Sequence, residues 1–269
     1  MIWKEEEGGL LVVYLKQTEM GSRRWAYTPG SSRNWPNPQL KQYAVHKTNN
    51  GSYYGMVATF DVYGYHLSDG QASVSAIWIG NLDGDYKSNL NSIAVGWERD
   101  AYQKTGCQNT RCPGFQVVSA SEIVPGAVID PVSNINGQRQ KITVAVFKDK
   151  TSGDWWIHYG FNSAPKAVGF YPANLFDSLD KKATHIAFGG AVGVLPSHTI
   201  TLPPMGSGSF PSDKAATVSD ISLSEEDGKT TPISADTATI ETKSTCYSTT
   251  PIQGAMFSYG GPGGCSAQV

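Results

Sequence analysis

Apolar and polar side chains alternate with a two-residue period along several short stretches of this chain. Val57, Thr59 and Asp61 alternate with three apolar neighbours, and the same pattern marks 73–81 and the segment KITVAVFK at 141–148. This period predicts strands that bury one face. Further apolar runs extend the series at 91–97, 115–118, 154–161, 167–171, 185–192 and 216–223.

Turn-forming residues separate these runs at short intervals. Pro125-Gly126, Asn136-Gly137 and Ser152-Gly153 are such breaks. Helical features are confined to 172–179, where a proline suits a first helical turn. Short strands with frequent turns predict an all-β protein, as a sandwich or a barrel. The 29 glycines, the 11 % aromatic residues and the 16 % charged residues favour the same class.

The strand pattern covers most but not all of the chain. Residues 1–45 are predicted to be an irregular N-terminal arm, although 10–15 has strand character, and residues 46–269 to be one β domain. Residues 224–239 are acidic, polar and rich in turns, which predicts a surface excursion.

Charge and hydropathy exclude two classes of partner. The net charge of −2 leaves no basic footprint for nucleic acid. No apolar run approaches the roughly 18 residues of a membrane span. Charged residues at 4–7 interrupt the apolar core that a signal peptide needs, so any leader is absent from this sequence.

Motifs for common catalytic and cofactor chemistry are missing. There is no HExxH, GxSxG, phosphate-binding loop or dinucleotide fingerprint, and the five histidines lack metal-ligand spacing. We therefore expect no metal and no cofactor. The four cysteines do not follow a zinc pattern, so disulfides in an oxidising compartment are favoured over free thiols. Asn50-Gly51-Ser52 is a possible glycan acceptor.

Two stretches look like strands whose ends face a common site. The first, NSIAVGWERDAYQKTGCQNTRCPGF, covers 91–115, and the second, HIAFGGAVG, covers 185–193. With further motifs they occur in the order found in the neprosin family, which this chain resembles from about Ala44 to Cys265. The most specific of these motifs are TGCQNTRCPGF at 105–115, GDWW at 153–156 and PPMGSG at 203–208.

The resemblance implies a fold and an activity. The expected fold is an antiparallel β-sandwich of jelly-roll type, secreted, with Cys107 bonded to Cys112 and Cys246 to Cys265. The expected activity is a glutamic peptidase that works at acid pH and cleaves Pro-containing peptides or proteins after proline. One glutamate would act as general base on water, and a second carboxyl group would stabilise the oxyanion.

The chain departs from the family pattern at the expected catalytic positions. Ala94 stands just before Gly-Trp, where many family members carry an acidic residue. Ala187, with Ala191 as an alternative, stands beside Phe-Gly-Gly, where acidic residues are again common. Alanine cannot transfer a proton, so catalysis should be impaired. Glu98 is a weak replacement candidate that is better interpreted as a solvated turn charge, and Asp61 is a second replacement candidate.

Aromatic residues are the candidates for substrate binding, because flat rings suit Pro-rich chains. These candidates, each of which could instead be a core residue, are Trp78, Trp97, Trp155, Trp156 and Phe188.

Three functions follow from the sequence. They are an active acid prolyl endopeptidase, an inert member that keeps peptide or partner binding, and, less favoured, a carbohydrate-binding sandwich.

Overall fold

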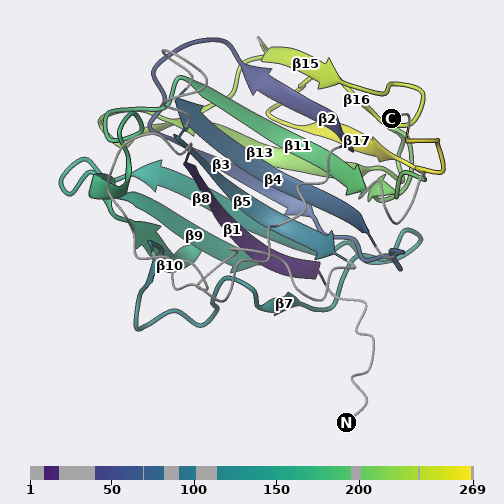
Figure 1. The fold of residues 1–269 in the computed structure, drawn as a ribbon, viewed down its shortest axis with the longest axis horizontal. Coiled ribbons are helices and arrows are strands. Elements are labelled where there is room, and N and C mark those ends of the chain that lie inside the picture. Colours follow the sequence, from purple (N-terminus) through teal and green to yellow (C-terminus); the bar gives the residue numbers. More distant parts are fainter. Residues whose placement is uncertain are drawn as a thin grey trace, which may run out of the picture.

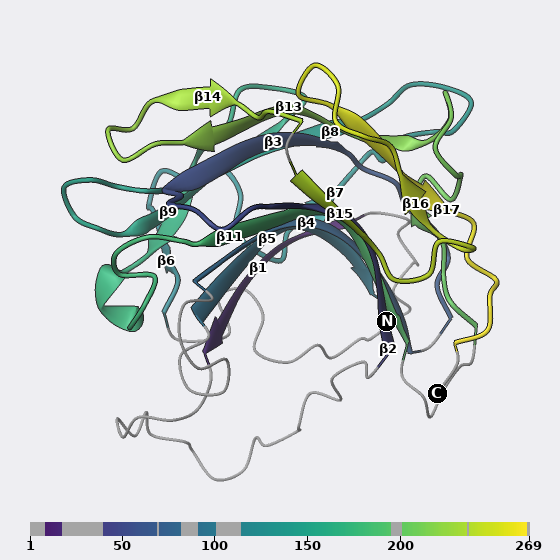
Figure 2. The ribbon, with the colours of Figure 1, turned by 90° about the horizontal axis from the view of Figure 1, so that it is seen from above.

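Two antiparallel β-sheets packed face to face form the protein in the computed structural model (Figures 1 and 2). The structure describes residues 9–17, 40–68, 70–81, 91–100, 114–194, 201–235 and 237–267. This arrangement confirms the predicted all-β sandwich, whereas the jelly-roll connectivity stays a prediction.

The first sheet has seven strands and curves with its concave side away from the second sheet (Figure 2). In spatial order its strands are β15 (Thr237–Glu241), β2 (Leu40–Thr48), β11 (His185–Val194), β4 (Gln71–Asn81), β5 (Asn91–Asp100), β1 (Gly9–Gln17) and β7 (Val128–Ile129).

The second sheet has ten strands and covers the convex side of the first (Figure 2). Eight of them form one path: β12 (Met205–Gly206), β17 (Phe257–Gly261), β13 (Ala216–Ser224), β3 (Gly55–Asp61), β8 (Lys141–Lys148), β9 (Trp155–Phe161), β10 (Lys166–Tyr171) and β6 (Gln116–Val117). Off this path, β14 (Thr230–Pro232) pairs with β13, and β16 (Ser248–Thr249) pairs with β17.

The predicted alternation decides which side chains enter the space between the sheets. In β8, Ile142, Val144 and Val146 are fully buried, while Thr143 between them is only partly buried. In β4, Ile77 and Ile79 are fully buried and Trp78 is partly exposed. The core is therefore built from alternate residues of both sheets, as a sandwich requires.

Three segments differ from their predicted structure. Residues 9–17, which the sequence analysis assigns to an irregular arm, form β1, and residues 10–17 pair with β5. Residues 40–45 of the same predicted arm belong to β2. The predicted surface excursion 224–239 contains β14 and the start of β15. Polar composition concealed these strands, because β14 and most of β15 are exposed and bury no apolar face. The division of the chain at residue 45 stays a prediction.

The predicted helix at 172–179 is a single 3₁₀ turn, η2 (Ala173–Leu175). The Asp154 carboxylate accepts a hydrogen bond from the Ala173 amide at 2.9 Å and satisfies one donor of the turn. Phe176 and Leu179 follow the turn and enter the core, where the Leu179 carbonyl accepts a hydrogen bond from the Trp155 indole at 2.9 Å. Extended backbone at Phe176 ends the turn.

One disulfide ties the C-terminal segment to the second sheet. Cys246 and Cys265 are bonded, with Cα atoms 6.3 Å apart, as the resemblance implied. The bond closes a loop that contains β16 and β17. The other predicted pair, Cys107 and Cys112, lies outside the described residues.

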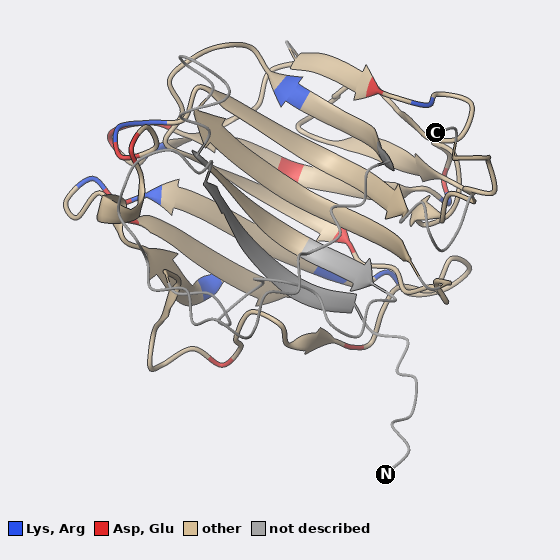
Figure 3. Ribbon diagram, viewed as in Figure 1, with Lys and Arg blue, Asp and Glu red and all other residues tan. Residues whose placement is uncertain are grey.

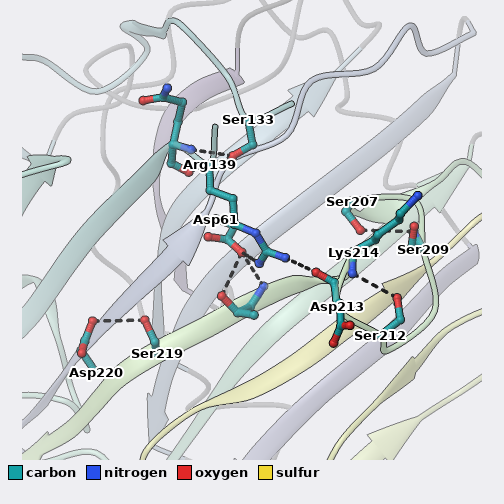
Figure 4. A network of polar contacts seen from close by, with 12 residues as sticks. Asp61, Ser133, Arg139, Ser207, Ser209, Ser212, Asp213, Lys214, Ser219 and Asp220 are labelled. Atoms are coloured by element: carbon teal, nitrogen blue, oxygen red, sulfur yellow. Dashed lines mark hydrogen bonds and ion pairs between the residues drawn. The ribbon is translucent and has the colours of Figure 1, made fainter. Parts of the chain in front are cut away.

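A buried carboxylate joins separate parts of the second sheet (Figure 4). Asp61 at the end of β3 is fully buried, and its Oδ2 accepts hydrogen bonds from the Thr217 amide and hydroxyl, each at 2.9 Å. The same oxygen forms an ion pair at 2.8 Å with Arg139, which also donates to the Asp213 carbonyl at 2.5 Å. Asp61 thus holds β3, β13 and two loops together.

Removal of this carboxylate should destabilise the fold strongly. Asp61→Ala leaves the Arg139 guanidinium and the Thr217 donors without their acceptor, so we expect a loss of about 3–5 kcal/mol in unfolding free energy. Urea denaturation measures the loss. Glu122→Ala is the control, because the Glu122–Lys166 pair at 3.0 Å is exposed and should contribute at most about 1 kcal/mol. Equal losses in the two variants would contradict the structural role of Asp61.

Candidate functional site

The two stretches singled out in the sequence lie close together in the first sheet. They form β5 and β11, which flank β4 (Figure 1). Ile93 and Val95 of β5 and Phe188 of β11 are fully buried between the sheets. Because side chains alternate along a strand, Ala94 and Ala187 lie on the opposite, concave face.

Strand register places four of the concave-face residues in one row. Ala94 is opposite Trp78, Trp78 is opposite Ala187, and Ala187 is opposite Lys47 of β2. We call this set the Trp78 row, and all four residues are partly exposed. Neighbouring strands lie about 4.8 Å apart, so the Cα atoms of Ala94 and Ala187 are about 10 Å apart on either side of the indole.

The alternative position, Ala191, belongs to a second row. Ala191 is opposite Val74 and Tyr43, and Val74 is opposite Glu98. We call this set the Val74 row. It lies four residues from the Trp78 row, which is about 13 Å along the strands. Ala191 is only 6 % exposed, so it is less accessible than Ala94 and Ala187.

Small residues fill the space between the two rows. Gly96, Ala76 and Gly189 lie opposite one another on β5, β4 and β11. A Cβ atom added at Gly96 would lie 2.5 Å from the Ala76 Cα and would clash with the backbone of β4. Glycine at this position therefore allows close approach of β5 to β4, and the face between the rows has no large side chain at these positions.

The described side chains of the two rows supply no acid or base of the expected kind. None of them is a carboxylate, and Lys47, which forms no ion pair with a described residue, is their one charged group. Figure 3 shows no Lys, Arg, Asp or Glu on β4 and β11, whereas β5 ends in Glu98, Arg99 and Asp100, whose side chains lie outside the described residues. Alanine methyl groups at both expected positions can neither take a proton from water nor stabilise an oxyanion.

The two replacement candidates lie away from the Trp78 row. Asp61 belongs to the second sheet, is fully buried and already accepts three hydrogen bonds. The backbone of Glu98 lies in the Val74 row, and its side chain is outside the described part of the chain. Neither observation brings a carboxylate to Ala94 or Ala187.

The predicted substrate-binding aromatics separate into different places. Trp78 is partly exposed on the concave face. Trp155 and Phe188 are fully buried in the core and cannot contact a surface-bound peptide. Trp156 is partly exposed in β9 of the second sheet, where its ring centroid is 4.8 Å from that of Phe170, and the Trp97 side chain lies outside the described residues.

Sequence reasoning did not identify His46, which lies in the core directly behind the candidate site. His46 is opposite Phe188, and its ring contacts Phe257 at a centroid distance of 4.5 Å. Its Nε2 lies 2.9 Å from the Thr250 carbonyl, so Nε2 carries the proton of the neutral ring and Nδ1 accepts from the Thr237 hydroxyl at 2.8 Å. Residues 42–48 read QYAVHKT and do not alternate between apolar and polar side chains, so the sequence carried no clear signal that His46 is buried.

Burial lowers the pKa of His46 below its ordinary value, and the Thr250 carbonyl and the charge of Glu241 oppose the shift only in part. Burial also lowers the pKa of His158.

Within the described ranges, no group of three His, Cys, Asp or Glu side chains could hold a metal ion. The site therefore has to be interpreted from its apolar and aromatic surface.

The buried His46 should make the fold less stable in acid. A histidine with a lowered pKa in the folded state contributes its stability above the unfolded value of 6.5, and this contribution is lost as the pH falls below it. We expect the unfolding free energy to fall from pH 6.5 to pH 5, by up to about 1.4 kcal/mol per pH unit for each such histidine. His46→Gln should reduce this slope in urea denaturation across that range. Identical slopes would contradict the assignment.

The described part of the chain contains no helix with the length and apolar character that a bilayer span requires.

Comparison with known families supports the sequence resemblance. The sequence model of the Neprosin family matches residues 66–262, which include β4, β5, β11 and the closing strand β17. This match covers most of the chain and includes both stretches of the candidate site. The chain therefore belongs to the neprosin family.

Proposed function

We propose that this chain is a catalytically impaired neprosin-type glutamic peptidase that binds Pro-containing peptides on the concave face of its first sheet. The observation that carries the proposal is the Trp78 row, in which Ala94 and Ala187 flank the indole at the positions expected to be acidic. The family match supports the peptidase ancestry, and the alanines support the impairment.

The expected reaction needs two carboxyl groups with different tasks. One removes a proton from water as the water attacks the peptide carbonyl, and the other stabilises the negative charge that develops on the carbonyl oxygen. In this chain methyl groups stand at both places. A water molecule at the Trp78 row would have no described base beside it, because the Asp61 carboxylate is buried in the second sheet, where it is bonded to Thr217 and Arg139.

The same face retains features that suit peptide binding. Gly96, Ala76 and Gly189 place no large side chain between the two rows. The partly exposed Trp78 offers an aromatic surface on which a proline ring can stack. Binding of this kind needs no proton transfer, so loss of catalysis leaves it intact.

We further propose that the protein is secreted. The Cys246–Cys265 disulfide supports this, because disulfides persist in oxidising compartments such as the extracellular space.

Carbohydrate binding is the second candidate, and the outer face of the second sheet supports it. Phe147, Trp156 and Phe170 lie opposite one another on β8, β9 and β10. His158 adjoins this row, with its ring 4.9 Å from that of Phe147. All four side chains are partly exposed. A sugar-array screen separates this alternative from peptide binding on the first sheet.

Cleavage of a fluorogenic Pro-containing peptide between pH 3 and pH 7 tests the impairment. We expect no cleavage by the chain as it stands, and cleavage by a variant with glutamate at both Ala94 and Ala187. The rate of the restored variant should exceed that of the parent by at least about 10²–10³, the effect of one oxyanion donor.

The second row supplies the matched comparison for this experiment. A variant with Ala94→Glu and Ala191→Glu places the second carboxyl in the Val74 row instead. Activity in this variant alone would move the second position to Ala191. Activity in the parent would contradict the impairment, and Glu98→Gln would then show whether Glu98 is responsible. Inactivity of both variants would contradict the assignment of these positions.

Peptide binding should depend on Trp78. Trp78→Ala removes the stacking surface, which contributes about 0.5–1.5 kcal/mol, so the Kd should rise roughly 2- to 10-fold. Fluorescence anisotropy with a labelled peptide of alternating Ala and Pro measures the change. Trp156→Ala is the control, because Trp156 is also partly exposed but lies on the second sheet. An equal loss in both variants, or equal binding of an Ala-Gly peptide, would contradict the proposed site.

A further inference from the structure

The connection between β2 and β3 carries the sequence Asn50-Gly51-Ser52, which is the one Asn-X-Ser/Thr triplet in the chain. Asn50 and Ser52 are both exposed, and Asn50 lies in a bend rather than in a strand. No described residue forms a hydrogen bond with the Asn50 carboxamide. The acceptor group of this triplet is therefore free to carry a substituent without loss of a described hydrogen bond.

The backbone around the triplet is held firmly although its side chains are exposed. The Gly51 amide donates to the Thr184 carbonyl at 3.1 Å, and the Tyr53 amide donates to the Ala183 carbonyl at 2.9 Å. The Tyr53 hydroxyl donates to the Asn49 carbonyl at 2.9 Å, and its ring packs so close to Gly51 that an added Cβ would lie 2.9 Å from it. These contacts fix the bend, and the exposed Ser52 hydroxyl accepts a hydrogen bond from the Lys182 ammonium at 2.7 Å.

We propose that Asn50 is an N-glycosylation site of the secreted protein. The inference rests on the secretion proposed above, since the donor is a polyprenyl-diphosphate-linked oligosaccharide of the secretory compartment. The Asn50 amide nitrogen forms a bond to the anomeric carbon of the first sugar and loses one proton. The bond from that carbon to the diphosphate oxygen breaks, and the polyprenyl diphosphate leaves.

The position also relates the glycan to the concave face. Asn50 follows Lys47 of the Trp78 row by three residues, which is about 10 Å along an extended chain. A glycan at Asn50 lies beside the end of β2, next to the start of β11, and outside the Trp78 row itself. It therefore bounds one end of the face on which the peptide is proposed to bind.

Expression of the full chain behind a heterologous leader in a eukaryotic secretory host tests the site. Intact mass should show one glycan, removed by a peptide N-glycosidase. Asn50→Gln and Ser52→Ala should each abolish it, because the first removes the acceptor nitrogen and the second removes the hydroxyl of the triplet. Ser52→Thr restores the triplet in the same place and should keep the glycan.

Asn136→Gln is the matched control, because Asn136 is also exposed and is also followed by glycine, but lies outside any triplet. It should keep the glycan. A parent chain with the mass of the bare polypeptide, or a glycan that persists in Asn50→Gln, would overturn the proposal. The mass is read on secreted and retained chains alike, so retention in the cell contradicts only the proposed secretion.

Discussion

The register of β4 between β5 and β11 is the constraint on which the candidate site depends. Because side chains alternate along a strand, a slip of one residue would exchange the core and concave faces of a strand. The buried isoleucines of β4 and the fully buried Phe188 of β11 hold the correct register. The same packing that forms the core thus sets Ala94, Trp78 and Ala187 in one row.

Fold and chemistry are separable in this architecture. The core contacts come from residues that face the second sheet, whereas the expected catalytic positions face away from it and contribute little to packing. Exchange of a carboxylate for a methyl group at Ala94 or Ala187 therefore costs no core contact. A chain can keep the fold of its family and lose the reaction of that family. The function of this chain therefore has to be argued from the side chains on the concave face of the first sheet and not from the fold.

The sequence predicts single strands well and their mutual placement poorly. The alternation at Lys141–Lys148 gives β8 with its observed bounds, because one face is apolar and the other is not. In β11 both faces are apolar or small, so the pattern cannot tell that Phe188 enters the core and Ala187 does not. The adjacent Trp155 and Trp156 point to opposite faces of β9, because successive side chains alternate along a strand. Only the order of the strands in the sheets tells which of the two faces each tryptophan occupies.

The partners of β2 have a consequence for how the chain folds. His46 bonds to Thr237, 191 residues further along, and β15 pairs with β2 as an edge of the first sheet. Neither this edge nor the contact of β3 with β13 can form before most of the chain has been synthesised. Topologies dominated by such distant pairings fold slowly. During biosynthesis β2 and β3 therefore each keep one edge unpaired until the C-terminal strands emerge, and unpaired strand edges are prone to aggregation.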